Sequence, residues 1–323
     1  MEIMNKYDYD LFERLVSLSQ SNLMYTMATY LRKKYDNVIS TNDYLVAIGD
    51  IPIALVAHMD TVFIRPVSNM YYDRQKGVLW SSEGLGADDR AGIFAILKIL
   101  KSGLRPSIIL TTDEEKGGLG ASKLSEINCP IPNLKYMIQL DRRGTNDCVF
   151  YDCNNLDFIQ YVSTFGFCER IGSFSDISFL MPSWNICGVN LSVGYENEHS
   201  LSETLHISAL YDTIKKVKCM LTAENIPDFE YIELDTYGSS NWWKKLNQTI
   251  DVDDDETLGF RCCHCKNPFS EYEIFPVKGR DGGTKFYCPD CIVGNVDWCA
   301  VCGEPYEITD PTVISLCQDC WGK

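Results

Sequence analysis

The sequence predicts a three-layer α/β domain followed by a small cysteine-rich module. Short apolar runs typical of buried strands alternate with segments of helical periodicity between about residue 40 and residue 223. An acidic run, DVDDDE at 251–256, then marks a boundary, because five acids in six residues are typical of a solvated linker. Nine of the 15 cysteines follow it, between Cys262 and Cys320. We therefore expect two domains of unlike composition.

The spacing of apolar residues assigns the elements of the first domain. Two helices are predicted near the start, where Leu11, Phe12, Leu15 and Val16 share one face and Leu23, Met24, Met27 and Leu31 share another. Buried strands are predicted at 44–49, 52–57, 107–112 and 136–140, and a further apolar run spans 186–193. Helices are predicted at 89–101, 156–165 and 208–223.

Charge and hydropathy exclude several classes of protein. The 323 residues include 45 Asp and Glu against 29 Lys and Arg, for a net charge of −16. Nucleic-acid binding depends on phosphate neutralisation, so a chain this acidic is a poor candidate for it. The longest apolar stretch in the first half, 51–57, is far short of the roughly 20 residues of a membrane span, and the first ten residues lack the apolar core of a signal peptide. We therefore expect a cytoplasmic protein without a membrane partner.

Histidines and carboxylates follow the predicted strands, which is where ligands bind in open α/β sheets. LVAHMDTV places His58 and Asp60 after one strand, and GLGADDRAG places Asp88 in a glycine-bounded turn before a helix. The remaining motifs are LTTDEEKGG with Glu114 and Glu115, QLDRRG with Asp141, and NEHSLSE with His199. A solvated loop tolerates any one of these groups. The set favours convergence, and carboxylates that converge stay ionised only if cations offset them, so we expect two divalent cations.

In order and spacing, these motifs resemble those of the co-catalytic zinc exopeptidases. The matching segments are HMDTV, GLGADDRAG, TDEEKGGLGA, QLD and NEHSLSE, and they cover roughly residues 40 to 220. The family includes peptidase T, glutamate carboxypeptidase and bacterial leucyl aminopeptidases. The resemblance implies an α/β/α fold around a mostly parallel mixed sheet.

The resemblance also implies a role for each matched residue. His58, Asp88 and Asp141 would hold one zinc ion, and Asp88, Glu115 and His199 would hold the other, with Asp88 bridging the two. Asp60 would orient His58 through its second ring nitrogen. Glu114 would be the general base that takes a proton from the attacking water and returns it to the leaving amine. The Asp88–Asp89 peptide would be cis.

Two intervals bear on the subfamily. The 58 residues between Asp141 and His199 are too few for the lid domain of about a hundred residues in the peptidase T group. The 30 residues from His58 to Asp88 leave no room for the insertion of the tetrahedral aminopeptidases, so the lidless aminopeptidases match better. There Asp176 in FSDISFL would lie in a pocket or beside the ligands, although a helix N-cap explains Ser175–Asp176 equally well.

Several neighbouring residues have simpler interpretations. His206 is typical of a residue at a helix start, and Glu203 of an acid that the helix dipole favours there. Arg142 and Arg143 would bind a substrate carboxylate or form surface salt bridges.

The tail contains four CxxC pairs, which supply enough thiolates for two structural zinc sites of four cysteines each. The pairs are Cys262 and Cys265, Cys288 and Cys291, Cys299 and Cys302, and Cys317 and Cys320. We predict sequential pairing, the first pair with the second and the third with the fourth, while cross-braced pairing and substitution by Cys263 or His264 stay open. With six basic and nine acidic residues from Arg261 onward, a structural role or a protein contact is favoured over nucleic acid.

Together these observations predict a cytoplasmic binuclear-zinc exopeptidase, most consistent with an aminopeptidase that acts on peptides. The expected organisation is a lidless catalytic domain at 1–240, an acidic linker at 241–260 and a double zinc-binding module, similar to a zinc ribbon, at 261–323. One alternative is an amidohydrolase that deacylates N-acyl amino acids or cleaves dipeptides. Another is an inactive adaptor that binds protein through its zinc module, although an adaptor has no need for a general base.

Overall fold

The computed structural model describes residues 3–172 and 174–233, together with shorter segments of the tail at 260–266, 268–269, 275–278, 284–287, 291, 296–298 and 305–307. The chain divides into two compact units, Met1–Thr236 and Tyr237–Lys323. The predicted acidic linker at 241–260 lies almost wholly outside the described residues. Among those residues, no helix combines the length and the apolar character that crossing a membrane requires.

An eight-stranded mixed sheet forms the centre of the first unit. Its order is β1 (Asn37–Ser40), β2 (Tyr44–Ile48), β6 (Pro106–Thr111), β3 (Ile51–His58), β7 (Tyr136–Arg142), β10 (Cys187–Ser192), β8 (Asp147–Val149) and β9 (Cys168–Glu169). The four central strands, β6, β3, β7 and β10, are parallel, whereas β1, β2 and β8 pair antiparallel with their neighbours toward the centre. This confirms the mostly parallel mixed sheet that the resemblance implied.

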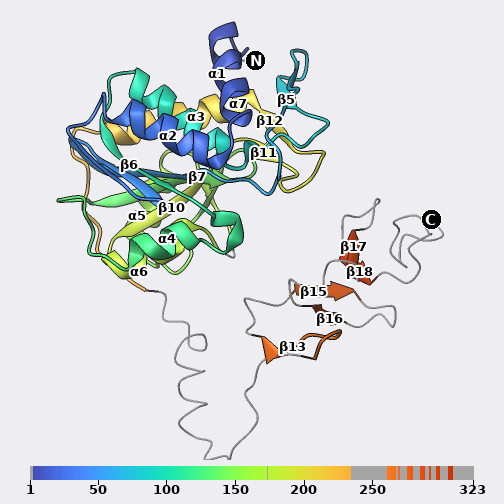
Figure 1. Cartoon of the computed structure of the whole chain (residues 1–323). Helices are drawn as coiled ribbons and strands as arrows, with labels where there is room; N and C mark the ends of the chain where they lie inside the picture. The colour runs from blue at the N-terminus through green and yellow to red at the C-terminus, as the bar shows by residue number, and fades with distance from the viewer. Residues whose placement is uncertain are drawn as a thin grey trace, which may run out of the picture. The chain divides into compact units, whose positions relative to one another are not determined.

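Helices cover both faces of this sheet (Figure 1). One layer contains α1 (Lys6–Val16), α2 (Gln20–Leu31), α3 (Ala87–Lys101) and α7 (Ile207–Leu221). The other contains α4 (Leu119–Ser125), α5 (Leu156–Ser163) and α6 (Asp176–Trp184). The predicted three-layer architecture is therefore confirmed. The helices predicted at 89–101, 156–165 and 208–223 correspond to α3, α5 and α7, with ends that differ by at most about two residues, whereas no helix was predicted at α4.

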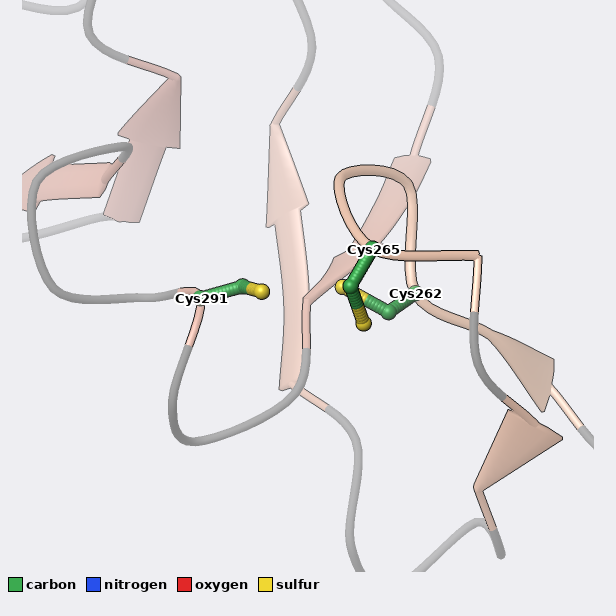
Figure 2. A group of neighbouring side chains, drawn as sticks. All are labelled: Cys262, Cys265 and Cys291. Carbon is green, nitrogen blue, oxygen red and sulfur yellow. The ribbon is translucent and has the colours of Figure 1, made fainter.

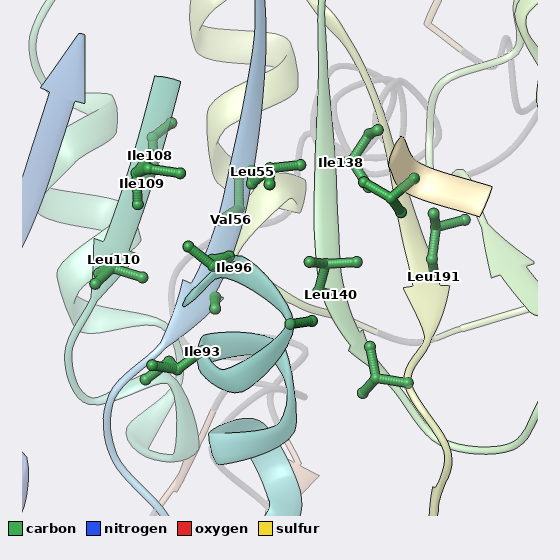
Figure 3. Close-up of a cluster of buried hydrophobic side chains, with 14 of the residues drawn as sticks. Leu55, Val56, Ile93, Ile96, Ile108, Ile109, Leu110, Ile138, Leu140 and Leu191 are labelled. Carbon is green, nitrogen blue, oxygen red and sulfur yellow. The ribbon is translucent and has the colours of Figure 1, made fainter. Parts of the chain in front are cut away.

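Aliphatic side chains fill the interface between the sheet and α3 (Figure 3). Leu55 on β3, Ile108 on β6 and Ile138 on β7 are fully buried, as is Ile93 on α3. Burial of one such side chain stabilises the fold by about 1.5–3 kcal/mol. Because the central strands are buried on both faces, many such contributions hold them in place. This core fixes the strand ends from which the candidate site is built.

A smaller sheet that the sequence did not predict lies beside this core. Its order is β11 (Tyr195–Glu196), β12 (Thr204–His206), β5 (Val78–Trp80) and β4 (Tyr71–Asp73). Strands of two or three residues give no detectable alternation of apolar and polar residues, which explains why they escaped prediction. Pairing of β12 with β5 brings the segment after residue 80 next to the loop that contains His199.

The second unit contains short strands and few buried apolar residues. β13 (Phe260–Arg261) pairs with β14 (Pro268–Phe269), and a four-stranded sheet has the order β16 (Thr284–Tyr287), β15 (Phe275–Lys278), β18 (Pro305–Glu307) and β17 (Val296–Trp298). Among its described residues, the buried core consists of Cys262, Val277, Tyr287 and Val296. A core this small requires additional stabilisation, such as a metal ion.

Candidate metal centre and active site

The carboxyl ends of three neighbouring parallel strands supply most of the candidate site. β3 ends at His58, β7 ends just after Asp141, and β6 leads into a short 3-10 helix, Glu114–Lys116. Because β6, β3 and β7 are adjacent and parallel, these ends lie at one edge of the sheet. The topology thus brings together side chains that are up to 83 residues apart in the sequence (His58 to Asp141).

The first ligand group contains His58, Asp88 and Asp141. Nε2 of His58 lies 3.1 Å from Oδ1 of Asp88 and 3.5 Å from Oδ1 of Asp141. All three side chains are buried. One ligand atom from each lies within 4.8 Å of the others, so the three can hold a single metal ion.

The second ligand group shares Asp88 with the first. Nε2 of His199 lies 3.1 Å from Oδ2 of Asp88 and 3.0 Å from Oε2 of Glu115. Each oxygen of Asp88 therefore faces a different imidazole. The other oxygen of Glu115, Oε1, is buried without a hydrogen-bond partner.

Asp60 connects His58 to the turn that contains the paired glutamates. Its Oδ1 lies 3.2 Å from Nδ1 of His58 and accepts a hydrogen bond from the backbone N–H of Glu114 at 3.0 Å. Its Oδ2 accepts from the backbone N–H of Glu115, also at 3.0 Å. Through these contacts Asp60 orients the imidazole and fixes the backbone of both glutamates.

Three side chains that the sequence analysis did not assign to the site donate to the carboxylate of Asp141. Ser175 Oγ donates at 2.8 Å, and Gln139 Nε2 and Tyr195 Oη donate at 3.1 Å. Asn190 pairs with the backbone of the same residue, accepting from its N–H and donating to its carbonyl. The sequence signal that could have identified Gln139 and Asn190 is that each is a polar residue within an otherwise apolar strand.

Asp88 lies in the first turn of α3, where its backbone is not helical. Its peptide bond to Asp89 is cis, as the resemblance implied. Asp89 is fully buried and accepts from the backbone N–H groups of His58 at 3.2 Å and Gly92 at 2.8 Å. Its carboxylate therefore links the end of β3 to the first turn of α3.

Negative charge dominates this site. Burial, followed by the neighbouring Asp88, raises the pKa of Asp141 to about 6. Burial raises the pKa of Glu114 to about 9, with further contributions from nearby carboxylates. Hydrogen bonds to Asp88 and Glu115 raise the pKa of His199 to about 11. Asp141 and Glu114 thus resist ionisation and His199 holds its proton, whereas hydrogen bonds to His199 and His58 outweigh burial and lower the pKa of Asp88. A donor set of this kind fits divalent cations.

Glu114 belongs to neither ligand group. It is partly buried and next to Glu115, and the charge of Asp176 contributes to its raised pKa. Asp176 begins α6 and accepts from Thr111 Oγ1 at 2.5 Å, while its Oδ1 is buried without a partner. Ser175 is the N-cap of α6, so this segment is a helix start that also contacts the ligand Asp141.

The other polar residues near these motifs have different roles. His206 is the N-cap of α7 and lies 3.3 Å from Glu196. Arg143 forms an ion pair with Glu198 at 2.7 Å, which is the surface salt bridge that the sequence left open. The prediction for Glu203 was wrong, because it does not begin the helix that follows it.

A cavity of about 510 Å³ adjoins the second ligand group. Its lining includes Asp60, Phe63, Arg65, Glu115 and Lys116. Phe63 packs where Gly84 has no side chain, since a Cβ at Gly84 would lie 2.1 Å from the ring. Two of the lining residues, Asp60 and Glu115, belong to the candidate site.

Three cysteines gather in the second unit (Figure 2). One sulfur from each of Cys262, Cys265 and Cys291 lies within 4.8 Å of the others. They come from the first and second CxxC pairs, which supports sequential pairing for this site. Cys263 instead accepts a hydrogen bond from the backbone N–H of Phe286 at 3.3 Å. The remaining predicted ligands, Cys288, Cys299, Cys302, Cys317 and Cys320, lie outside the described residues.

Known proteins resemble this chain in structure but not in sequence. No family model and no curated protein matches the sequence. The structure is similar to a tripeptidase from Staphylococcus aureus (TM-score 0.53, 16% identity), covering 68% of this chain and 98% of that one. It is also similar to aminopeptidase PepT from Bacillus cereus (TM-score 0.51, 14% identity, 68% and 98% covered) and to a TET aminopeptidase from a marine sediment thaumarchaeon (TM-score 0.51, 14% identity, 69% and 98% covered).

The first unit has the same fold as these peptidases. The resemblance drawn from the motifs is thereby confirmed at the level of the fold. The residues between Asp141 and His199 form β8, α5, β9, α6, β10 and β11. β8, β9 and β10 belong to the central sheet, and β11 belongs to the smaller sheet.

Proposed function

We propose that this chain is a metal-dependent aminopeptidase that hydrolyses short peptides. The observation that carries the proposal is the pair of ligand groups joined through the two oxygens of Asp88, beside a glutamate that belongs to neither. A structural metal site closes its coordination with protein ligands, whereas carboxylate-rich pairs of sites with an adjacent base are typical of hydrolases.

In this proposal each ligand group holds one divalent cation, most consistent with zinc because imidazole and carboxylate ligands suit it. His58 and Asp141 would hold one cation, Glu115 and His199 would hold the other, and Asp88 would serve both. When bound, the cations supply Lewis acidity toward the scissile carbonyl and lower the pKa of water from about 15.7 toward roughly 7.

Glu114 is the proposed general base. Its carboxylate takes the proton of the attacking water, and the resulting carboxylic acid returns that proton to the amine of the leaving group. The proximity of two cations would lower the raised pKa of Glu114, so that it accepts a proton near neutral pH. Asp60 keeps the backbone of Glu114 in place through the hydrogen bond at 3.0 Å.

The cavity beside the site supports a small substrate. A volume of about 510 Å³ suffices for a few amino-acid residues, and Arg65 and Lys116 in its lining would attract a carboxylate. The same machinery would serve a dipeptidase or a deacylase of N-acyl amino acids, which is the alternative function. An inactive adaptor is less consistent with this site, because it has no use for Glu114.

The proposal extends to the organisation of the chain. Residues 1–240 would form the catalytic domain, 241–260 the linker, and 261–323 a module with two structural zinc ions in four-cysteine sites. Such a module would serve a structural role or bind a protein. We place the protein in the cytoplasm, where CxxC thiols stay reduced and available to zinc.

Hydrolysis of a substrate panel tests the function. Aminoacyl amides and tripeptides with a free amino terminus should be cleaved at least about tenfold faster than their N-acetylated forms. Faster cleavage of N-acyl amino acids would support the deacylase instead. No hydrolysis of any substrate by the chain loaded with zinc or manganese would leave only the adaptor.

A further inference from the structure

The carboxylate of Glu203 is buried next to the second ligand group without belonging to it. The side chain is 1% exposed, and no Lys, Arg or His of the described residues pairs with it. Its Oε2 accepts a hydrogen bond from the backbone N–H of Gly86 at 2.5 Å, and its Oε1 accepts from the backbone N–H of Asp88 at 3.0 Å. In both hydrogen bonds the two partners are more than 110 residues apart in the sequence.

These hydrogen bonds fix the turn that presents Asp88. Gly86 has φ of +64°, a left-handed conformation that glycine adopts at little cost. The N–H groups at the start of α3 have no partner within the helix, so a buried carboxylate satisfies them and compensates the helix dipole. The position of Asp88 therefore depends on an acceptor from another loop.

Glu203 also belongs to the loop that contains His199. This loop connects β11 to β12, and the backbone N–H of Glu203 donates to the carbonyl of Ser200 at 3.1 Å. His199 is held at φ of +60°, and its side chain is about half exposed. Packing against the core thus does little to fix His199, and the buried residues nearest to it along the chain are Tyr195 and Glu203, each four residues away.

We propose that Glu203 is a positioning residue that sets the distance between Asp88 and His199 and so controls cation affinity at the second ligand group. This inference rests on the proposed function. One oxygen of Glu203 fixes the backbone of Asp88, and the burial of the same side chain anchors the loop that contains His199. Without it, Nε2 of His199 and Oδ2 of Asp88, now 3.1 Å apart, would sample a wider range of separations.

The test is titration of the full chain with Mn²⁺, after mild chelation has emptied the carboxylate site, by calorimetry. Mn²⁺ prefers carboxylate and imidazole over thiolate, so the cysteine sites do not compete. Glu203→Gln keeps the shape but turns an amide N–H₂ toward a backbone N–H. We expect it to weaken one of the two Mn²⁺ sites by about 10–100-fold. The matched control is Glu196→Gln, an exposed acid at the start of the same loop, with both affinities within about twofold of the parent.

Further measurements separate positioning from folding. Glu203→Asp is too short to reach both N–H groups, so it should also lose affinity. Because it keeps the charge, its loss should be smaller than that of Glu203→Gln. Both variants should unfold cooperatively without metal. Unchanged Mn²⁺ affinities in Glu203→Gln, or failure of both metal-free variants to fold, would overturn the inference. A parent chain that binds no pair of Mn²⁺ ions would instead refute the proposed function.

Discussion

The two candidate metal-binding regions of this protein are built in opposite ways. In the first unit His58, Glu115 and Asp141 lie at or just after the ends of strands whose apolar residues are buried on both faces. In the second unit, Cys262 is itself one of the four buried core residues that can be described. A large core can therefore hold ligands in place before a cation arrives, whereas a small one depends on the cation for its fold. This difference predicts different responses to the same perturbations.

Removal of all metal should give the largest effect and separate the two regions most clearly. A strong chelator should abolish hydrolysis and unfold the second unit, while the first unit keeps its fold. Hydrogen exchange measures this directly: amides of β3, β6 and β7 should stay protected, and those of β15 and β16 should lose protection. Loss of protection in β3 would show that the first unit also depends on metal.

Replacement of the proposed base should disable the first region without emptying it. Glu114→Gln should lower kcat by about 10²–10⁴-fold, because the amide cannot accept the proton of the attacking water. Both catalytic cations should stay bound, as measured by metal analysis after gel filtration. Glu115→Gln is the matched variant, and it should lose one cation. Equal metal loss in both variants would contradict the division of roles between the two glutamates.

Asp60 gives a smaller effect that acts through its neighbours. Asp60→Asn leaves one oxygen to serve three donors, from His58, Glu114 and Glu115. We expect cation affinity to fall by about 10–100-fold, measured by competition with a fluorescent chelator. The control, Asp113→Asn in the same turn, should change affinity little because Asn tolerates the positive φ of 54° found there. If both variants behave alike, Asp60 has no special part in the site.

Acid should weaken the first unit through a residue far from the metal centre. Burial alone would raise the pKa of Asp8, but hydrogen bonds from Lys98 and Tyr211 outweigh it and lower this pKa. The carboxylate therefore contributes stability above its unfolded pKa of about 3.9, and this contribution is lost as the pH falls through the lower folded value.

Urea unfolding at several pH values tests this prediction. Asp8→Asn should destabilise the chain near neutral pH, and the difference from the parent should shrink toward about pH 3. The control is Asp10→Asn, an exposed acid on the same helix, which should change the free energy of unfolding little at either pH. A difference for Asp8→Asn that stays constant with pH would contradict the lowered pKa.

Truncation should give the smallest effect on catalysis. A chain of residues 1–260 contains every proposed catalytic ligand, so small-substrate hydrolysis should stay within roughly twofold of the parent. The second unit would instead affect which larger peptides the enzyme hydrolyses. A truncated chain that binds its cations but fails on small substrates would show that the tail contributes to the active site.

The sequence predicted the central architecture because its signals are local. Runs such as 52–57 and 136–140 are long enough to show the uniform apolar character of buried parallel strands, and β3 and β7 cover them. The candidate ligands were equally easy to predict from the sequence, since His58 and Asp141 follow those runs directly. The gathering of these residues in the structure agrees with the motifs, while their chemical roles are still predictions.

Contacts that depend on distant segments were not predictable in this way. Tyr195 and Ser175 reach Asp141 only after β10 and α6 are in place, and neither stands in an unusual sequence context. Glu203 was assigned to the helix that follows it, but its hydrogen bonds go to the start of α3, more than 110 residues earlier. Helix-start rules identify the kind of interaction that an acid favours but not which helix supplies it.

We propose above that one carboxylate, that of Asp88, joins two cations at the edge of the main sheet. A crystal structure of the zinc-loaded protein, with anomalous difference maps recorded at the zinc absorption edge, tests it most directly. The account predicts two peaks about 3.5–4 Å apart, one beside His58 and Asp141 and one beside Glu115 and His199, with Asp88 between them. A single peak, or none among these residues in a fully loaded crystal, would contradict it.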